Sequence, residues 1–319
     1  MVGIEHLREP CYAVVELGTA GNVNGLKHVA AEYPSAVAHS GNVSQPHKAQ
    51  LLKARDVLLH ELVEALHLLV LLKYLEKAGL LNNSIVIYTS DHGEMQGEHG
   101  LKGKGGNIYE NNIHVPLIIY HPEMKGGRHC YNLTSHLDLA PTFVDIATAG
   151  NVQQFSAITQ ELHGHSLMPA VKNPATDIRN SEGALFCFEM ISMIDGDYVM
   201  NPSLKPAYRA DMNKRGFVRG IITPDYKFAR YFAPVKFNTP ADYEALWADN
   251  DVELLMCGTD ETENLAWPKD NNANQQLVEL MNQKLNALIQ REIGTDDGSE
   301  TKKGYKGGVE MYDKNKYDQ

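Results

Sequence analysis

Short apolar runs alternate with longer helical patterns through the first half of the chain. Each run is rich in β-branched or aromatic residues and stops at a turn, as expected for buried parallel strands. Strands are predicted near Tyr12–Glu16, at Ile85–Thr89 and at Leu117–Tyr120, and helices at Lys48–Lys77 and Asp138–Ala149. This alternation predicts an α/β fold with a mostly parallel sheet flanked by helices.

The pattern changes after about Gly183, where shorter runs separated by Pro or Gly predict antiparallel strands. These strands are predicted at Ala184–Met190, Gly216–Thr223 and Tyr226–Tyr231. Apolar residues at helical spacing over Asn274–Arg291 predict a helix that packs against this small sheet. We therefore expect a core over residues 1–180, an α+β subdomain over 181–293, and a polar tail over 294–319 that is disordered or bound to a partner.

Composition narrows the possible partners. The net charge of −11 argues against nonspecific binding of nucleic acid, which needs an excess of Lys and Arg. The most apolar stretch, Val57–Leu75, contains five charged or imidazole side chains, so it predicts a core helix and no membrane span. Four scattered cysteines predict free thiols. The first residues show no signal-peptide pattern, so we expect a cytoplasmic protein if the start is natural, and the localisation is otherwise open.

Candidate chemistry follows the strand that ends at Thr89. Asp91 offers a carboxylate oxygen and His92 an imidazole nitrogen, and in a turn both side chains can face one divalent cation. Lys102 and Lys104 follow in a glycine-rich loop and supply positive charge for an anionic ligand. A metal and anion site is predicted at the carboxyl end of this strand, where ligands bind in α/β sheets.

Several ordered segments follow one another around these residues: TSDHGEMQGEHG, GKG and YENNIHVPLIIY, then SHLDLAPTFVDIATAG, LHGHSLMPAV, GFVRGIITPDYKFARYF and TDETENLAWP. In this order they resemble the sulfatase family, in its arylsulfatase-like form, within the alkaline phosphatase superfamily. Together they extend roughly from Leu58 to Glu292 and resemble the C-terminal portion of the family. The resemblance implies an incomplete alkaline phosphatase-like α/β fold with a small antiparallel C-terminal subdomain.

The resemblance also implies roles for single residues. It casts Asp91 and His92 as metal ligands and Lys104, in the GKG element, as the lysine that contacts the sulfate ester. Lys102 is either a second anion contact or a surface charge. Calcium is the metal that the resemblance implies, with Mg, Mn or Zn left open. Four further carboxylates can complete the metal shell but are better explained as surface or capping residues: Glu94, Glu98, Glu110 and Asp138. His99 is expected to shape its loop.

One family motif does not occur in the sequence. None of the four cysteines begins the Cys-x-Pro-Ser-Arg type motif from which sulfatases make their formylglycine nucleophile. Three functions therefore stay open: a sulfuric ester hydrolase acting on a small sulfate ester, inactive if no nucleophile is supplied; a phosphatase or phosphodiesterase of the same superfamily; or a truncated, non-catalytic relative. An incomplete sheet would expose apolar surface, so we expect a homo-oligomer.

Overall fold

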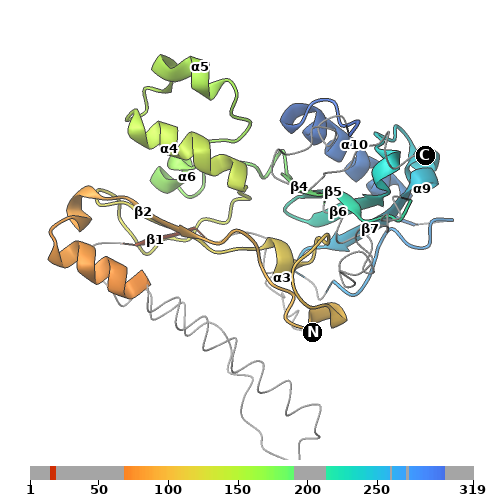
Figure 1. The fold of residues 1–319 in the computed structure, drawn as a ribbon, viewed down its shortest axis with the longest axis horizontal. Coiled ribbons are helices and arrows are strands. Elements are labelled where there is room, and N and C mark those ends of the chain that lie inside the picture. The colour runs from red at the N-terminus through yellow and green to blue at the C-terminus, as the bar shows by residue number, and fades with distance from the viewer. Residues whose placement is uncertain (1–14, 19–67, 190–212, 259–260, 271–272, 299–319) are drawn as a thin grey trace, which may run out of the picture. The chain divides into compact units, whose positions relative to one another are not determined.

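The computed structural model describes residues 15–18, 68–189, 213–258, 261–270 and 273–298 (Figure 1). Its contacts divide the chain into two compact units. The first unit comprises residues 15–88 and 117–129, and the second comprises residues 1–14, 89–116 and 130–319. In this division, residues 89–116 group with the C-terminal part of the chain, and the domain boundary expected near residue 180 stays a prediction.

The first unit contains a three-stranded sheet in the order β1-β3-β2. Its strands are β1 (Val15–Gly18), β2 (Val86–Thr89) and β3 (Leu117–Tyr120). β1 and β3 are parallel, with Val15 beside Leu117, and a larger parallel core stays a prediction. Residues 68–77 are helical, and the helix ends at Gly79, whose φ of 70° is the left-handed conformation that favours glycine at this position. A short 3-10 helix, Leu81–Asn83, leads into β2.

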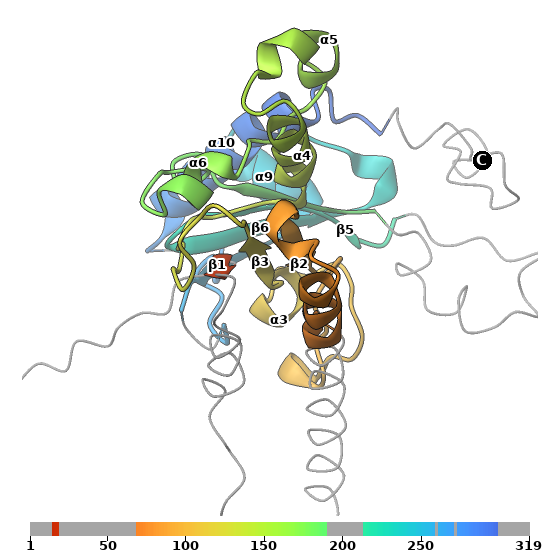
Figure 2. The ribbon, with the colours of Figure 1, turned by 90° about the vertical axis from the view of Figure 1, so that its left-hand side faces the viewer.

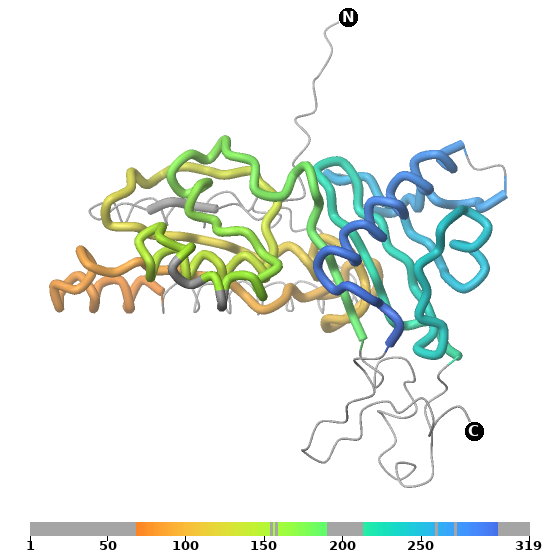
Figure 3. The backbone as a smooth tube through the Cα atoms, turned by 90° about the horizontal axis from the view of Figure 1, so that it is seen from above, coloured from red at the N-terminus to blue at the C-terminus, as the bar shows by residue number. Residues whose placement is uncertain are grey.

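The second unit contains an antiparallel four-stranded sheet in the order β4-β5-β6-β7. The strands are β4 (Ala184–Phe188), β5 (Phe217–Ile222), β6 (Tyr226–Phe232) and β7 (Asn250–Met256). Two helices, α9 (Tyr243–Asp249) and α10 (Gln275–Glu292), lie on one face of this sheet (Figures 2 and 3). Ile221, Phe228 and Leu254 point to this face and form one core with Leu285 of α10. Burial of this apolar surface is the main stabilising contribution here.

The opposite face of the same sheet packs against the segment that precedes α3 (Glu110–Ile113). Ile108 of this segment is fully buried and forms a second core with Val218, Ala229 and Leu255. Side chains of a strand alternate between the two faces, so each strand contributes to both cores. The sheet therefore supports α10 on one face and the region of the predicted site on the other.

The remaining described elements of the second unit are short. The 3-10 helices are η2 (Glu98–Gly100), η3 (His136–Asp138), η4 (Val152–Phe155) and η6 (Pro234–Lys236), and the α-helices are α4 (Leu139–Ala147), α5 (Ser156–Thr159) and α6 (Met168–Lys172). η3 begins with a capping box in which Ser135 and Asp138 bind each other's backbone. Asp138 thus caps a helix, as the sequence suggested.

Most predicted elements that fall on described residues are present with shifts of one or two residues. The antiparallel arrangement of the C-terminal strands and the packing of α10 on them are confirmed. α9, β7 and the short helices α3, α5 and α6 were not predicted. Predictions at residues 12–14, 48–67 and 299–319 lie outside the described residues. Within the tail, Asp296 is described and forms an ion pair with Arg219.

Candidate metal and anion site

The candidate site begins where β2 ends, in a turn at Ser90–Gly93. The Ser90 hydroxyl donates a hydrogen bond to the carbonyl oxygen of His92 at 2.9 Å, and the His92 backbone N–H donates to the Asp91 carboxylate at 3.0 Å. The turn is anchored through Gly93, whose N–H donates to the Asn112 carbonyl at 2.9 Å. A Cβ at Gly93 would lie 2.0 Å from the Asn111 carbonyl oxygen, so only glycine permits this approach.

The side chains of Asp91, His92 and Lys104 meet in this turn. Nε2 of His92 lies 3.3 Å from Oδ2 of Asp91 and 2.6 Å from Nζ of Lys104. Asp91 is 82% exposed and His92 is 37% exposed, so the cluster faces solvent. The structure therefore brings together three residues that are separated by up to thirteen positions in the sequence, including both predicted metal ligands and the predicted anion contact.

The hydrogen bonds of His92 leave one ring nitrogen available as a ligand. Its Nδ1 lies 2.8 Å from the Gly93 carbonyl oxygen, which only accepts hydrogen bonds, so Nδ1 carries the proton. Nε2 then keeps its lone pair on the side of Asp91 and Lys104. A backbone carbonyl that fixes the tautomer in this way is a usual partner of metal-binding histidines.

Asp91 is suited to hold a cation at neutral pH. Burial alone would raise the pKa of its carboxyl, but His92, the backbone N–H groups of Asp91 and His92, and Lys104 together lower this pKa. The carboxylate and Nε2 of His92 thus provide two donors of the kinds that divalent metals use. Within the described ranges, no three His, Cys, Asp and Glu side chains are placed to hold a metal ion together, and the assignment of Asp91 and His92 as metal ligands stays a prediction.

Lys104 belongs to a loop whose backbone is held on both sides. Residues 103–109 are called the site loop below. The buried side chain of Asn112 donates hydrogen bonds to the carbonyls of Gly105 and Asn107, both at 2.8 Å. The carbonyl of Gly103 accepts a hydrogen bond from the N–H of Met95 at 3.0 Å. These bonds limit where the Lys104 side chain can reach.

Other residues considered from the sequence lie elsewhere or have other partners. Lys102 is exposed, and its assignment to the anion site stays a prediction. Glu94 and Glu98 are exposed. Glu110 is paired with His114 and Lys227, and the buried Asp138 is paired with Arg179. His99 stacks on Tyr109 with ring centroids 4.0 Å apart, in agreement with a role in shaping the loop.

The sequence reasoning missed a residue that supports the turn. Nε2 of His136 lies 2.8 Å from the carbonyl oxygen of Ser90 and donates to it. His136 lies in η3 and comes from the segment SHLDLAPT, which carried the family resemblance without pointing to this contact. The segment SHLDLAPT was the signal that could have pointed to His136. The contact itself has no local sequence pattern, because it joins residues 46 positions apart.

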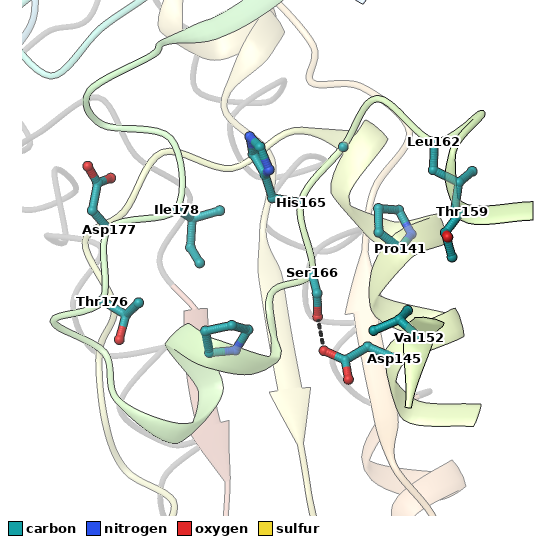
Figure 4. Close-up of a pocket in the computed structure, with 12 residues that line it drawn as sticks. Pro141, Asp145, Val152, Thr159, Leu162, His165, Ser166, Thr176, Asp177 and Ile178 are labelled. Atoms are coloured by element: carbon teal, nitrogen blue, oxygen red, sulfur yellow. Dashed lines mark hydrogen bonds between the residues drawn. The ribbon is translucent and has the colours of Figure 1, made fainter. Parts of the chain in front are cut away.

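A separate cavity of about 440 Å³ lies in the second unit, between α4 and the segment that leads to α6 (Figure 4). At its wall, the Ser166 hydroxyl donates a hydrogen bond of 2.5 Å to Asp145, while His165 binds Glu182. Since Ser166 and His165 have different partners, they do not form a nucleophile and base pair. The cavity lining includes none of Asp91, His92 and Lys104.

A protein-family model matches the part of the chain that contains the candidate site. The sulfatase family model matches residues 25–149. The chain is 41% identical over 95 residues to arylsulfatase K of Canis lupus familiaris, a match that covers 30% of this chain and 16% of the relative. It is 39% identical over 104 residues to N-acetylglucosamine-6-O-sulfatase of Bacteroides thetaiotaomicron, which covers 32% of this chain and 17% of that protein.

The fold also resembles solved structures. The structure of BT4656 in complex with its substrate D-glucosamine-2-N,6-O-disulfate matches with a TM-score of 0.53 and 23% identity, over 77% of this chain and 42% of that chain. The two curated matches each span less than a fifth of the relative's length. Residues 25–149 are therefore similar to part of a sulfatase domain.

Proposed function

We propose that this chain provides the metal-binding and anion-binding part of a sulfuric ester hydrolase site. Asp91 and His92 bind a divalent cation, and Lys104 binds the sulfate group of a small-molecule ester. The observation that carries the proposal is the convergence of a carboxylate, an imidazole and an ammonium group at one exposed turn, with Nε2 of the imidazole facing the other two groups. The matched family model includes all three residues.

Each residue has a definite chemical task in this proposal. The ammonium of Lys104 offsets the negative charge that develops on ester oxygens as the bond to sulfur breaks. A divalent cation, when bound, holds and polarises the sulfate oxygens. The turn bonds from Ser90 and His136 orient Asp91 and His92 toward the ligand. No residue of this chain is assigned as nucleophile, because the formylglycine motif does not occur in the sequence.

The donor set leaves the identity of the cation open. Calcium, which the family resemblance implies, takes oxygen ligands, whereas imidazole nitrogen is an ordinary ligand of zinc and other transition metals. One carboxylate and one imidazole are compatible with Ca, Mg, Mn or Zn. We take calcium as the first cation to test and zinc as the second.

The first experiment separates the three functions that the sequence left open. Release of the phenol from an aryl sulfate and an aryl phosphate is measured with and without EDTA, together with sulfate release from N-acetylglucosamine 6-sulfate. EDTA-sensitive sulfate release that is lost in Asp91→Ala supports the hydrolase. Phosphate release alone supports a phosphatase, and no release from any substrate supports a non-catalytic relative. Asp270→Ala, which removes an exposed carboxylate near α10, serves as the control.

A binding experiment tests the site even if the chain binds the cation and sulfate without hydrolysing an ester. Calorimetric titration with calcium chloride or zinc chloride, followed by sodium sulfate, reports the two parts of the site separately. We expect Asp91→Ala to lose cation binding and Lys104→Ala to lose sulfate binding while keeping the cation. Sulfate binding that is unchanged in Lys104→Ala would contradict the assigned role.

A further inference from the structure

A buried ionic cluster lies directly behind the site loop. Lys227 of β6 is 0% exposed, and its Nζ binds the carboxylates of both Glu110 and Glu261. Glu110 is the first residue of α3 and follows the site loop without a gap. Its backbone N–H also donates to Oε2 of Glu261 at 2.9 Å. We call Glu110, Lys227 and Glu261 the Lys227 clamp, since together they hold the end of the site loop by its backbone and by a side chain.

Polar contacts of Tyr109 add a second attachment to the same sheet face. The hydroxyl of Tyr109 donates to one oxygen of Glu253 at 3.0 Å, and the hydroxyl of Tyr231 donates to the other at 2.7 Å. Burial and the charge of Glu253 raise the pKa of Tyr109 to about 12, so its hydroxyl remains a donor. The ring of Tyr109 in turn supports His99 by stacking.

Packing at Ile108 and Gly106 completes the attachment. Ile108 is fully buried between Val218, Ala229 and Leu255. At Gly106, a Cβ would lie 2.7 Å from the ring of Phe188, so the loop backbone presses directly on the sheet. Residues 106, 108, 109 and 110 are thus all held by one face of the four-stranded sheet.

Little chain separates these attachments from the anion-binding group. Lys104 lies two positions before Gly106, and an extended residue spans only about 3.4 Å. The intervening Gly105 is itself held by Asn112. A change in the position of α3 would therefore be passed to the backbone of Lys104 and to its distance from His92.

The ion pairs of the Lys227 clamp hold Glu110 in a defined position. Apolar contacts alone tolerate small sliding movements, whereas a lysine between two carboxylates has defined partners and directions. Removing the lysine leaves two carboxylates close together with no cation between them, which favours movement of Glu110 toward solvent.

We propose that Lys227 is a positioning residue for Lys104: through Glu110 it holds the site loop so that the Lys104 ammonium meets Asp91 and His92. The anion-binding part of this inference rests on the proposed function, and the effect on the loop does not. The antiparallel sheet therefore acts on the site through the Lys227 clamp, in addition to forming the C-terminal core.

The test compares Lys227→Met with Arg230→Met. Arg230 is a matched control because it is a second buried cation on β6, on the opposite face, where its guanidinium binds Asn282 and Asn286 of α10. Amide hydrogen exchange of the site loop and of Glu110 is measured together with the affinity for sodium sulfate. Lys227→Met is expected to speed exchange at these amides and weaken sulfate binding by about tenfold or more. Arg230→Met is expected to lower the thermal midpoint while leaving both quantities close to wild type.

The results that would contradict a positioning role for Lys227 are as follows. Exchange in Lys227→Met that equals wild type, or equal changes in the two variants, would overturn it. If Lys227→Met does not fold, Glu110→Gln weakens the clamp from its half-buried side and gives the same readouts, with Lys227→Arg as the conservative variant that restores the charge. If wild type binds no sulfate, the proposed function fails, and the exchange data alone decide whether Lys227 positions the loop.

Discussion

Two groups of charged side chains in the same unit differ in whether their polar atoms are accessible to a ligand. In the candidate site, the Asp91 carboxylate is largely exposed, and Nε2 of His92 contacts the exposed side chains of Asp91 and Lys104. In the Lys227 clamp, the cation is fully buried and both carboxylates are directed at it. The exposed group can exchange an internal partner for a ligand, whereas the buried group is satisfied internally and has a supporting role.

The same contrast holds for a second buried cluster below η3. Arg179 is 0% exposed and binds both oxygens of Asp138 at 2.9 Å and Glu292 of α10 at 2.7 Å. Asp138 also accepts the N–H groups of Ser135 and His165. This cluster fixes the turn that carries His136, and His136 binds the carbonyl of Ser90. Buried charges therefore support both the Ser90–Gly93 turn and the site loop.

The largest expected loss of stability follows from removing a buried cation. Arg179→Met leaves Asp138 and Glu292 buried without their cation, so we expect the free energy of unfolding to fall by about 3–5 kcal/mol in urea titrations. Arg215→Met is the control, because Arg215 pairs with the exposed Asp251 and its loss is expected to cost about 0–1 kcal/mol. Similar losses in the two variants would remove the distinction between buried and exposed clusters.

A smaller loss is expected where the turn contacts its neighbour. In Gly93→Ala, the new Cβ would collide with the Asn111 carbonyl, and overpacking of this kind costs about 1–3 kcal/mol. Because the turn must move, calcium or zinc binding should weaken as well, which calorimetry measures. Unchanged cation affinity in a destabilised Gly93→Ala would show that the site does not depend on this docking.

The pH dependence of stability reports on the Lys227 clamp. Burial alone would raise the pKa of Glu110, but the hydrogen bond from His114 and the charge of Lys227 lower it to about 2 from the ordinary 4.5. A lowered carboxyl pKa stabilises the folded state above the unfolded-state value, and this stabilisation is lost as the pH falls from about 4.5 toward 2. Glu110→Gln should show a flatter decline of the unfolding free energy across this interval; an identical decline would contradict the clamp.

The smallest effect on stability is expected at the site itself. Asp91 is exposed, so Asp91→Ala should leave the free energy of unfolding close to that of wild type while cation binding is lost. Thermal melts without added metal, alongside calorimetry, separate the two effects. A large loss of stability in Asp91→Ala would place this residue with the buried clusters.

The elements that the sequence predicted are those whose pattern is local. β2, β3, β5 and β6 are apolar runs bounded by Gly, Pro or Asn, and α10 repeats apolar residues at helical spacing. β7 was missed because its sequence, NDVELLM, begins with two polar residues and follows α9 directly. Within the described residues, no helix is long and apolar enough to span a membrane.

The site was predictable only in its local part. Asp91, His92 and Lys104 follow one strand within fourteen residues, so their types and spacing were visible in the sequence. Lys227 binds Glu110 across 117 positions and His136 binds Ser90 across 46. Such contacts depend on strand order and on which face each side chain takes, neither of which the local pattern specifies.

The central claim is that Asp91, His92 and Lys104 act together as one cation and anion site. Its most direct test is calorimetric titration of wild type, Asp91→Ala and Lys104→Ala with calcium chloride or zinc chloride and then with sodium sulfate. The account predicts a cation site in wild type that is lost in Asp91→Ala, and sulfate binding that is lost in Lys104→Ala. Cation and sulfate binding that are equal in all three proteins would contradict it.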